Sequence, residues 1–149
     1  MSEVSGIPCV TTAESIVAAL NFLKIKKISV ATPYHEALNA HEVEFLAVNN
    51  FETVEISGLG IGATGPHEYI EIARTAKHKI ETHILSVDHI DAEAILVSCT
   101  DFPSISIIPE LERKIKKPII TSNQATFWAS LRAAGIQDRV GNWGILLAT

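Results

Sequence analysis

The chain has 149 residues, of which 47% are hydrophobic and 19% charged, and its formal net charge is −5. This composition is typical of one globular domain that buries a core without metal ions or disulfide bonds, and it excludes disorder. The net negative charge, without clusters of Lys and Arg among aromatic residues, argues against a surface that binds nucleic acid.

No apolar run in the sequence is long enough to cross a bilayer, and the first residues lack the basic and apolar segments of a signal peptide. We therefore expect a cytoplasmic protein with no membrane partner. Two cysteines, Cys9 and Cys99, do not make a secreted disulfide framework, so both are expected to be free thiols.

Helical and extended patterns alternate along the chain. In chain order they predict a helix at 11–24, a strand at 28–32, a helix at 36–49, a strand at 52–57, a helix at 67–89, a strand within 94–98, a helix at 103–115, a strand at 118–121, a helix at 122–133 and a last strand at 141–147. Thr11 and Glu14 form the pattern of a capping box. Pro33 is expected to end the first strand, and the helix at 67–89 to break near His78. The alternation in 52–57 suits an edge strand.

Strands joined by helical crossovers predict a doubly wound, mostly parallel sheet of about five strands with helices on both faces, a flavodoxin-like arrangement. We expect residues 6–149 to form this single α/β domain and residues 1–5 to be a short polar lead. No repeats or linkers interrupt the pattern.

Polar side chains follow two of the predicted strands, where ligands collect in open α/β sheets. Cys99 comes after an apolar run and before the helix that Pro103 is expected to open, so the helix N-terminus would favour a thiolate there. Tyr34 follows the first strand, and its phenol can hydrogen-bond a carboxylate. Two plainer interpretations stay open, in which Cys99 is a small buried thiol and Tyr34 a half-buried tyrosine on the rim.

The glycines Gly60, Gly62 and Gly65 have the spacing of a dinucleotide fingerprint. The fingerprint also requires an acidic residue at the end of the next strand, but Asp88 and Asp91 precede that strand. We therefore expect a flexible loop that can close over a ligand, and a nucleotide-binding flavodoxin-like module is the weakest alternative.

Three histidines, His78, His83 and His89, lack the spacing of metal ligands, and no cysteine lies near them in the sequence. They are expected to be exposed residues of a helix. The sequence thus predicts no metal site.

Four ordered segments carry a family resemblance, and they cover nearly the whole chain from Gly6 onward. The segments are Thr11–Ser15, Ala31–Tyr34, Ser98–Phe102 and Ser122–Trp128. They resemble the C-terminal half of maleate cis-trans isomerases, which belong to the aspartate/glutamate racemase superfamily together with arylmalonate decarboxylases.

The resemblance implies two similar α/β domains that face each other across a cleft, with one cysteine from each domain and no cofactor. In such an isomerase one thiolate is thought to add to the substrate double bond, while the other thiol handles a proton. Cys99 matches the catalytic cysteine of the second domain. Tyr34 matches a tyrosine that contacts substrate, and Thr100 and Ser98, the neighbours of Cys99, are expected to bind the substrate with it. The resemblance implies a small carboxylate, either a dicarboxylate or an amino acid, as the substrate.

The first domain of that family, with its own cysteine, has no counterpart in this sequence, and Cys9 lies in the wrong segment to replace that thiol. One copy of the chain is therefore not expected to hold a complete two-thiol site. A homo-oligomer or a complementary first-half domain would supply the rest. The alternative is an inactive remnant or truncated domain that serves as a binding or oligomerisation module.

Overall fold

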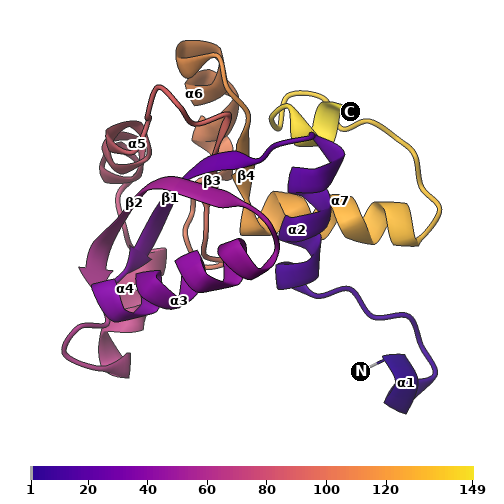
Figure 1. Cartoon of the computed structure of the whole chain (residues 1–149), viewed down its shortest axis with the longest axis horizontal. Helices are drawn as coiled ribbons and strands as arrows, with labels where there is room; N and C mark the ends of the chain where they lie inside the picture. Colours follow the sequence, from indigo (N-terminus) through magenta and orange to yellow (C-terminus); the bar gives the residue numbers. More distant parts are fainter. Residues whose placement is uncertain (1) are drawn as a thin grey trace.

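Four strands form one fully parallel sheet in the order β2-β1-β3-β4 (Figure 1). The structure, a computed structural model, describes residues 2–149. The strands are β1 (Lys27–Tyr34), β2 (Glu52–Ile61), β3 (Ala94–Val97) and β4 (Ile119–Thr121). The α-helices are α1 (Ser2–Ser5), α2 (Thr12–Phe22), α3 (Glu36–Val48), α4 (Ile70–Ala73), α5 (Lys77–Ser86), α6 (Ile108–Ile115) and α7 (Ser122–Ala133). Short 3₁₀ turns are η1 (Pro66–Tyr69), η2 (Ile105–Ile107) and η3 (Leu146–Ala148).

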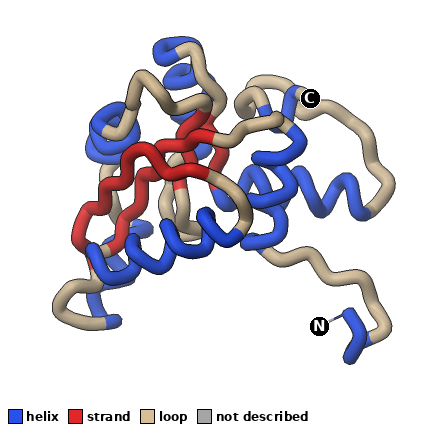
Figure 2. Tube along the Cα trace, in the orientation of Figure 1, coloured by secondary structure: helices blue, strands red, loops and turns tan. Residues whose placement is uncertain are grey.

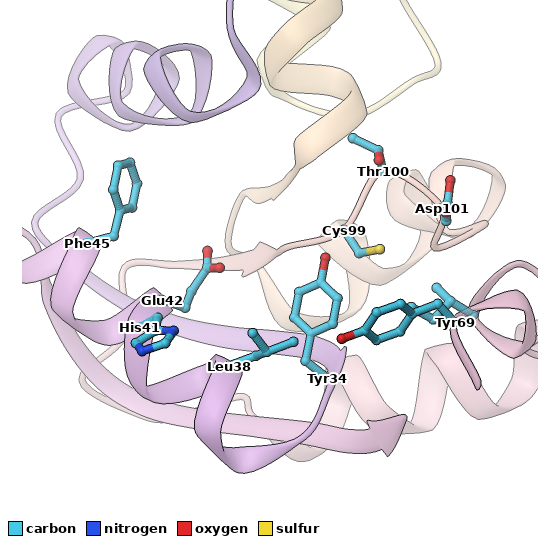
Figure 3. Close-up of a pocket in the computed structure, with 10 residues that line it drawn as sticks. Tyr34, Leu38, His41, Glu42, Phe45, Tyr69, Cys99, Thr100 and Asp101 are labelled. Carbon is cyan, nitrogen blue, oxygen red and sulfur yellow. The ribbon is translucent and has the colours of Figure 1, made fainter. Parts of the chain in front are cut away.

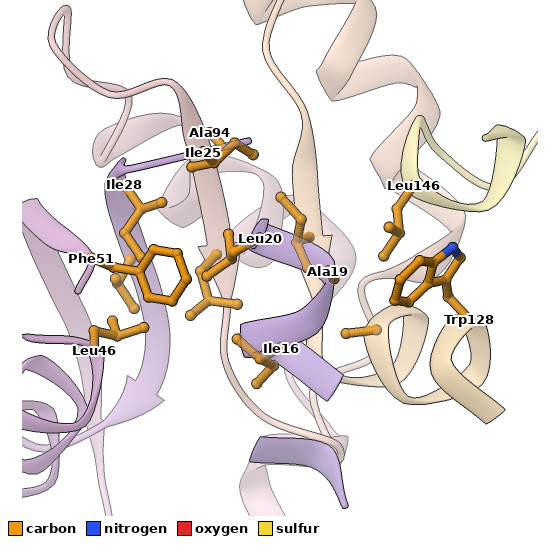
Figure 4. Packing of buried hydrophobic residues seen from close by; sticks show 14 of the residues in the cluster. Ile16, Ala19, Leu20, Ile25, Ile28, Leu46, Phe51, Ala94, Trp128 and Leu146 are labelled. Atoms are coloured by element: carbon orange, nitrogen blue, oxygen red, sulfur yellow. The ribbon is translucent and has the colours of Figure 1, made fainter. Parts of the chain in front are cut away.

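Helices cover both faces of the sheet, as Figure 2 shows. Successive residues of a strand point to opposite faces, so each strand feeds two apolar clusters. In β3, Ala94 and Leu96 join the cluster with α2, α3 and α7, and Ile95 and Val97 join the cluster with α5 and α6. The first cluster surrounds Leu20 and includes Trp128 (Figure 4). The predicted doubly wound α/β domain is confirmed.

The first strand continues through Pro33 to Tyr34, so the prediction that Pro33 ends it is wrong. Proline has no N–H for the ladder, and the register between β1 and β2 shifts between Thr32 and Tyr34. The Tyr34 amide donates to Thr32 Oγ1 at 3.1 Å. The strand thereby delivers the Tyr34 side chain at its last position.

A fifth strand at 141–147 does not form, and the described sheet has four strands. Asn142 and Gly144 have φ of 68° and 100°, which breaks the extended backbone that a strand requires. Side chains instead cover the open edge of β4. Glu112 Oε1 accepts the Ile119 amide at 2.8 Å and Gln124 Oε1 accepts the Thr121 amide at 3.1 Å, so these donors need no further strand.

Two predicted helices differ in detail. The pattern at 67–89 is divided into η1, α4 and α5, and the break falls at 74–76, just before the expected position at His78. The helix expected from Pro103 begins with a 3₁₀ turn at Ile105 and becomes α-helical at Ile108. Half of the predicted capping box forms at the N-cap of α2: Thr11 Oγ1 accepts the Glu14 amide at 3.2 Å, while Glu14 Oε2 accepts the Thr11 hydroxyl at 2.7 Å in place of the Thr11 backbone amide. Among residues 2–149, no helix is both long and apolar enough to span a membrane.

Candidate functional site

The carboxyl ends of β1 and β3 lie side by side at the centre of the sheet. Here the connections leave the sheet in opposite directions, because β2 follows on one side of β1 and β3 lies on the other. Open α/β sheets bind ligands at such a switch point. Tyr34 ends β1 and Cys99 follows β3, so two of the predicted residues meet at this place.

A cavity of about 510 Å³ opens at these strand ends (Figure 3). Its lining comes from β1, α3, the η1–α4 segment and the turn after β3, and consists of Tyr34, Leu38, His41, Glu42, Phe45, Tyr69, Ile72, Cys99, Thr100 and Asp101. A second cavity of about 300 Å³ adjoins it and shares five of these residues, adding Ser98, Ser122 and the start of α2. The four residues that the sequence singled out, Cys99, Tyr34, Thr100 and Ser98, therefore lie around one connected space.

The Tyr34 hydroxyl and the Cys99 sulfur form a hydrogen bond at the wall of this space. Burial raises the pKa of Tyr34 well above its ordinary value, and the hydrogen bond to Cys99 raises this pKa further. The phenol is therefore protonated at neutral pH and donates to the sulfur. Such a donor stabilises negative charge on its partner. The Cys99 side chain is 8% exposed and still lines both cavities, which makes it accessible to a small ligand.

Glu42 is the carboxyl group that faces the same two cavities. It projects from α3, and burial raises its pKa above the ordinary value, against the opposing effect of a hydrogen bond from Ser98. Its charge also raises the pKa of Tyr34. Ser98, Glu42, Tyr34 and Cys99 thus form one electrostatically connected group.

Hydrogen bonds fix the backbone on both sides of the site. Asn123 Nδ2, in the first turn of α7, donates to the Thr100 carbonyl at 2.9 Å and holds the turn after β3. Thr32 Oγ1 donates to Asn39 Oδ1 at 2.6 Å and ties the end of β1 to α3. These contacts hold the backbone that carries Cys99 and Tyr34, and neither contact involves those two side chains.

The glycine-rich segment closes one side of the cavity through Tyr69. Glu68 Oε2 accepts the Gly62 amide at 2.8 Å, and Glu68 Oε1 accepts the Thr64 hydroxyl at 2.6 Å, so the loop satisfies its own donors. Gly62 has a φ of 95°, and a Cβ there would lie 2.3 Å from Tyr69 Cε1. Glycine is therefore required for Tyr69 to lie against the cavity.

The expected position of Cys99 beside the start of a helix is wrong. A turn, an irregular segment and a 3₁₀ turn separate Cys99 from α6, which begins at Ile108. The sequence pattern of Pro103 followed by helically spaced isoleucines placed this helix too early. The contact that the structure gives to the sulfur is the phenol of Tyr34, not a helix N-terminus.

His83 is a second correction, because it is buried rather than exposed. Its Nε2 lies 2.8 Å from the Thr32 carbonyl, and burial lowers its pKa despite the backbone hydrogen bonds. His83 therefore supports the end of β1 from the face of the sheet on which α5 lies, opposite to α3. The described residues contain no group of three or more His, Cys, Asp or Glu side chains arranged to hold a metal ion.

The sequence interpretation missed Glu42, Phe45 and Tyr69 as residues of the site. A signal for Glu42 was present, because it lies four residues after Leu38 and three before Phe45, on the same helix face as these inward-pointing residues. No local pattern marks Tyr69, because its position at the cavity depends on how the glycine-rich segment before it folds.

The sequence and the fold of this chain are similar to those of known proteins. The family profile described as arylmalonate decarboxylase matches residues 1–147, so the chain belongs to the arylmalonate decarboxylase family, within the aspartate/glutamate racemase superfamily. Arylmalonate decarboxylase from Bordetella bronchiseptica is 27% identical over 91% of this chain and 55% of that protein. Maleate isomerase from Alcaligenes faecalis is 24% identical over 95% of this chain and 54% of that protein.

Among solved structures, the maleate isomerase variant C200A from Pseudomonas putida S16, crystallised with maleate, has a TM-score of 0.89 and 26% identity. The match covers 99% of this chain and 57% of that one. The chain therefore spans about half the length of the relatives it matches.

Proposed function

We propose that this chain forms a cysteine-dependent site that converts a small carboxylate without a cofactor, and that maleate, isomerised from cis to trans, is its substrate. The observation that carries the proposal is the hydrogen bond from the Tyr34 phenol to Cys99 in a cavity at the switch point of the sheet. A sulfur anion held in this way is a suitable nucleophile for addition to a polarised double bond.

The polar groups of the cavity support a carboxylate ligand. Thr100 and Ser98 bring hydroxyl groups to the walls on which Cys99 lies. Hydroxyl donors suit a carboxylate and the enolate-like charge that develops when sulfur adds to the neighbouring carbon. In this proposal Cys99 is the nucleophile, and Tyr34, Thr100 and Ser98 bind the substrate. The apolar side chains Leu38 and Phe45 exclude water around the reacting carbons.

We further propose that residues 6–149 correspond to the second domain of a two-domain relative, and that a second copy or a complementary first-half domain covers the cavity. The chain spans about half the length of the relatives, which supports one domain of such a protein. A cytoplasmic location belongs to the same proposal.

The test measures conversion of maleate to fumarate by the purified chain, with phenylmalonate and aspartate as further substrates for decarboxylation and racemisation. The variant is Cys99→Ser, and the matched control is Cys9→Ser. Cys9 is the other free thiol and lines neither cavity. We expect Cys99→Ser to abolish turnover and Cys9→Ser to leave it unchanged. Sedimentation at the assay concentration shows whether the active species is an oligomer.

Turnover that survives Cys99→Ser would disprove the cysteine mechanism. If none of the three substrates reacts, alone or with a complementary first-half domain added, the proposed activity is wrong and the binding-module alternative stands. An active monomer would contradict the shared site but not the role of Cys99.

A further inference from the structure

Glu42 is a carboxyl group inside the candidate site that no part of the family resemblance assigns. In Figure 3 its carboxyl and the Cys99 sulfur lie on the two sides of the Tyr34 ring. Glu42 and Cys99 line both cavities, so a ligand that fills this space contacts the two groups together. The partner that the structure gives to the Glu42 carboxyl is the Ser98 hydroxyl, and this contact leaves acceptor positions open toward the cavity.

We propose that Glu42 is the proton-transfer partner of Cys99, holding a proton beside the cavity and exchanging it with the substrate carbon next to the one that the sulfur attacks. This inference rests on the proposed function of the site. It would make Glu42 a catalytic residue, in the place that the family resemblance gives to a second thiol.

The steps balance without any further reagent. The Cys99 thiolate forms a C–S bond to one alkene carbon, and the π-electron pair moves to the neighbouring carbon, which takes the proton of the Glu42 carboxylic acid. The former double bond is now single and rotates. The Glu42 carboxylate then removes the proton from that carbon, the electron pair restores the double bond in the trans form, and the C–S bond breaks to release the thiolate.

Other titratable groups around the cavity are less suited to this role. His41 and Asp101 are exposed and line the first cavity but not the second. Tyr34 keeps its proton, because burial and the contact with Cys99 raise its pKa. Glu42 is partly buried and lines both cavities, and burial raises its pKa above the ordinary value, which favours the acid form that can donate a proton. A neutral Glu42 also does not repel a carboxylate substrate, as an ionised one would.

The test compares Glu42→Gln with Glu44→Gln in the same protein. Glu44 is on the same helix, is exposed and lines neither cavity. We expect Glu42→Gln to lower kcat by about 10²- to 10⁴-fold, the usual range for a positioned acid–base group, with a much smaller change in KM. Glu44→Gln should leave both unchanged, and Glu42→Asp should restore part of kcat.

A pH profile separates this role from a structural one. The wild-type rate needs the sulfur anionic and Glu42 protonated, so it should rise and then fall with pH. The alkaline fall should be absent in Glu42→Gln. If Cys99→Ser abolishes turnover while Glu42→Gln retains wild-type kcat and the alkaline fall, the role of Glu42 is refuted and the proposed function stands. If the wild-type protein has no turnover, the proposed function fails, and this inference with it.

Discussion

Two glutamates that lie out of full contact with water, the buried Glu112 and the partly buried Glu42, differ in the partners of their carboxyl groups. Glu112 on α6 accepts the Ile119 amide with one oxygen and the Ile145 amide with the other, both at 2.8 Å. Glu42 on α3 has the Ser98 hydroxyl as its partner and otherwise faces a cavity. Burial raises the pKa of both groups. The difference indicates that burial alone does not mark a candidate functional carboxyl, because its acceptor positions must also be open to a ligand.

We call the residues around Glu112 the closed region, because their polar atoms pair with one another. We call the residues around Glu42 the open region, because they line the candidate site. Glu112 covers the edge of β4 and binds the segment that follows α7. Gln124 acts beside it, because its Oε1 accepts the Thr121 amide and its Nε2 donates to the Trp143 carbonyl. Every polar atom named in this region has a partner within the chain. A cavity of about 510 Å³ also lies here, lined in part by Glu112, but both oxygens of this carboxyl already accept backbone amides.

The largest change in stability is predicted for a variant that removes a hydrogen bond from the closed region. Glu112→Gln keeps the shape of the side chain but replaces one acceptor oxygen with an NH₂ group, so one of the two backbone amides loses its acceptor. We expect the free energy of unfolding to fall by about 1–3 kcal/mol. Thermal and urea denaturation measure this change. Glu42→Gln serves as the comparison, and its change should be within about 0.5 kcal/mol, the usual range where no such contact is lost. Equal losses in the two variants would contradict the contrast.

The sequence predicted the open region better than the closed one. Tyr34 and Cys99 could be placed because each follows a β-favouring run, and the ends of parallel strands share one edge of a sheet. The closed region depends on contacts between distant residues. The short apolar run at 141–147 looks like a strand, and no local pattern shows that Glu112 and Gln124 already cover the edge it would pair with.

Glu42 and His83 were missed for a related reason. Helical periodicity marks which face of a helix points inward, but it does not tell whether a polar residue on that face meets packed side chains, a cavity or a backbone carbonyl. His83 meets the Thr32 carbonyl and Glu42 meets the cavity. Only the assembled sheet distinguishes the two cases.

An intermediate effect is expected at the rim of the open region. Gly62→Ala places a methyl group 2.3 Å from Tyr69 Cε1 and requires a left-handed backbone with a side chain, as φ is 95°. The backbone strain should cost about 1–2 kcal/mol. The control is Gly60→Ala, where φ is 77° but nothing lies within 4 Å of the added atom.

The two glycine variants should therefore lose similar stability in thermal denaturation, and only Gly62→Ala should displace Tyr69 from the cavity. The rate of Cys99 alkylation by iodoacetamide, followed by mass spectrometry in a Cys9→Ser background, reports this displacement. We expect faster alkylation in Gly62→Ala, because the cavity is less covered. The same rate in both variants would show that Tyr69 does not shield the sulfur.

The smallest effect concerns the pH dependence of stability and compares the two carboxyls directly. The raised pKa of Glu42 means that the folded protein holds this proton more tightly than the unfolded chain does. Its stabilising contribution is complete below the ordinary value of 4.5 and is lost as pH rises through the raised pKa. Glutamine does not titrate, so the Tm of Glu42→Gln minus that of the wild type should increase from pH 4 to pH 8. His83, whose lowered pKa acts in the opposite direction, contributes equally to both proteins and cancels.

The pKa of Glu112 is also raised, so the Tm difference between Glu112→Gln and the wild type should rise with pH in the same way. The loss of one hydrogen bond lowers that difference by a constant amount at every pH. A flat difference for Glu42→Gln would mean that Glu42 is ionised as readily in the folded protein as in the unfolded chain, and it could then hold no proton for the substrate.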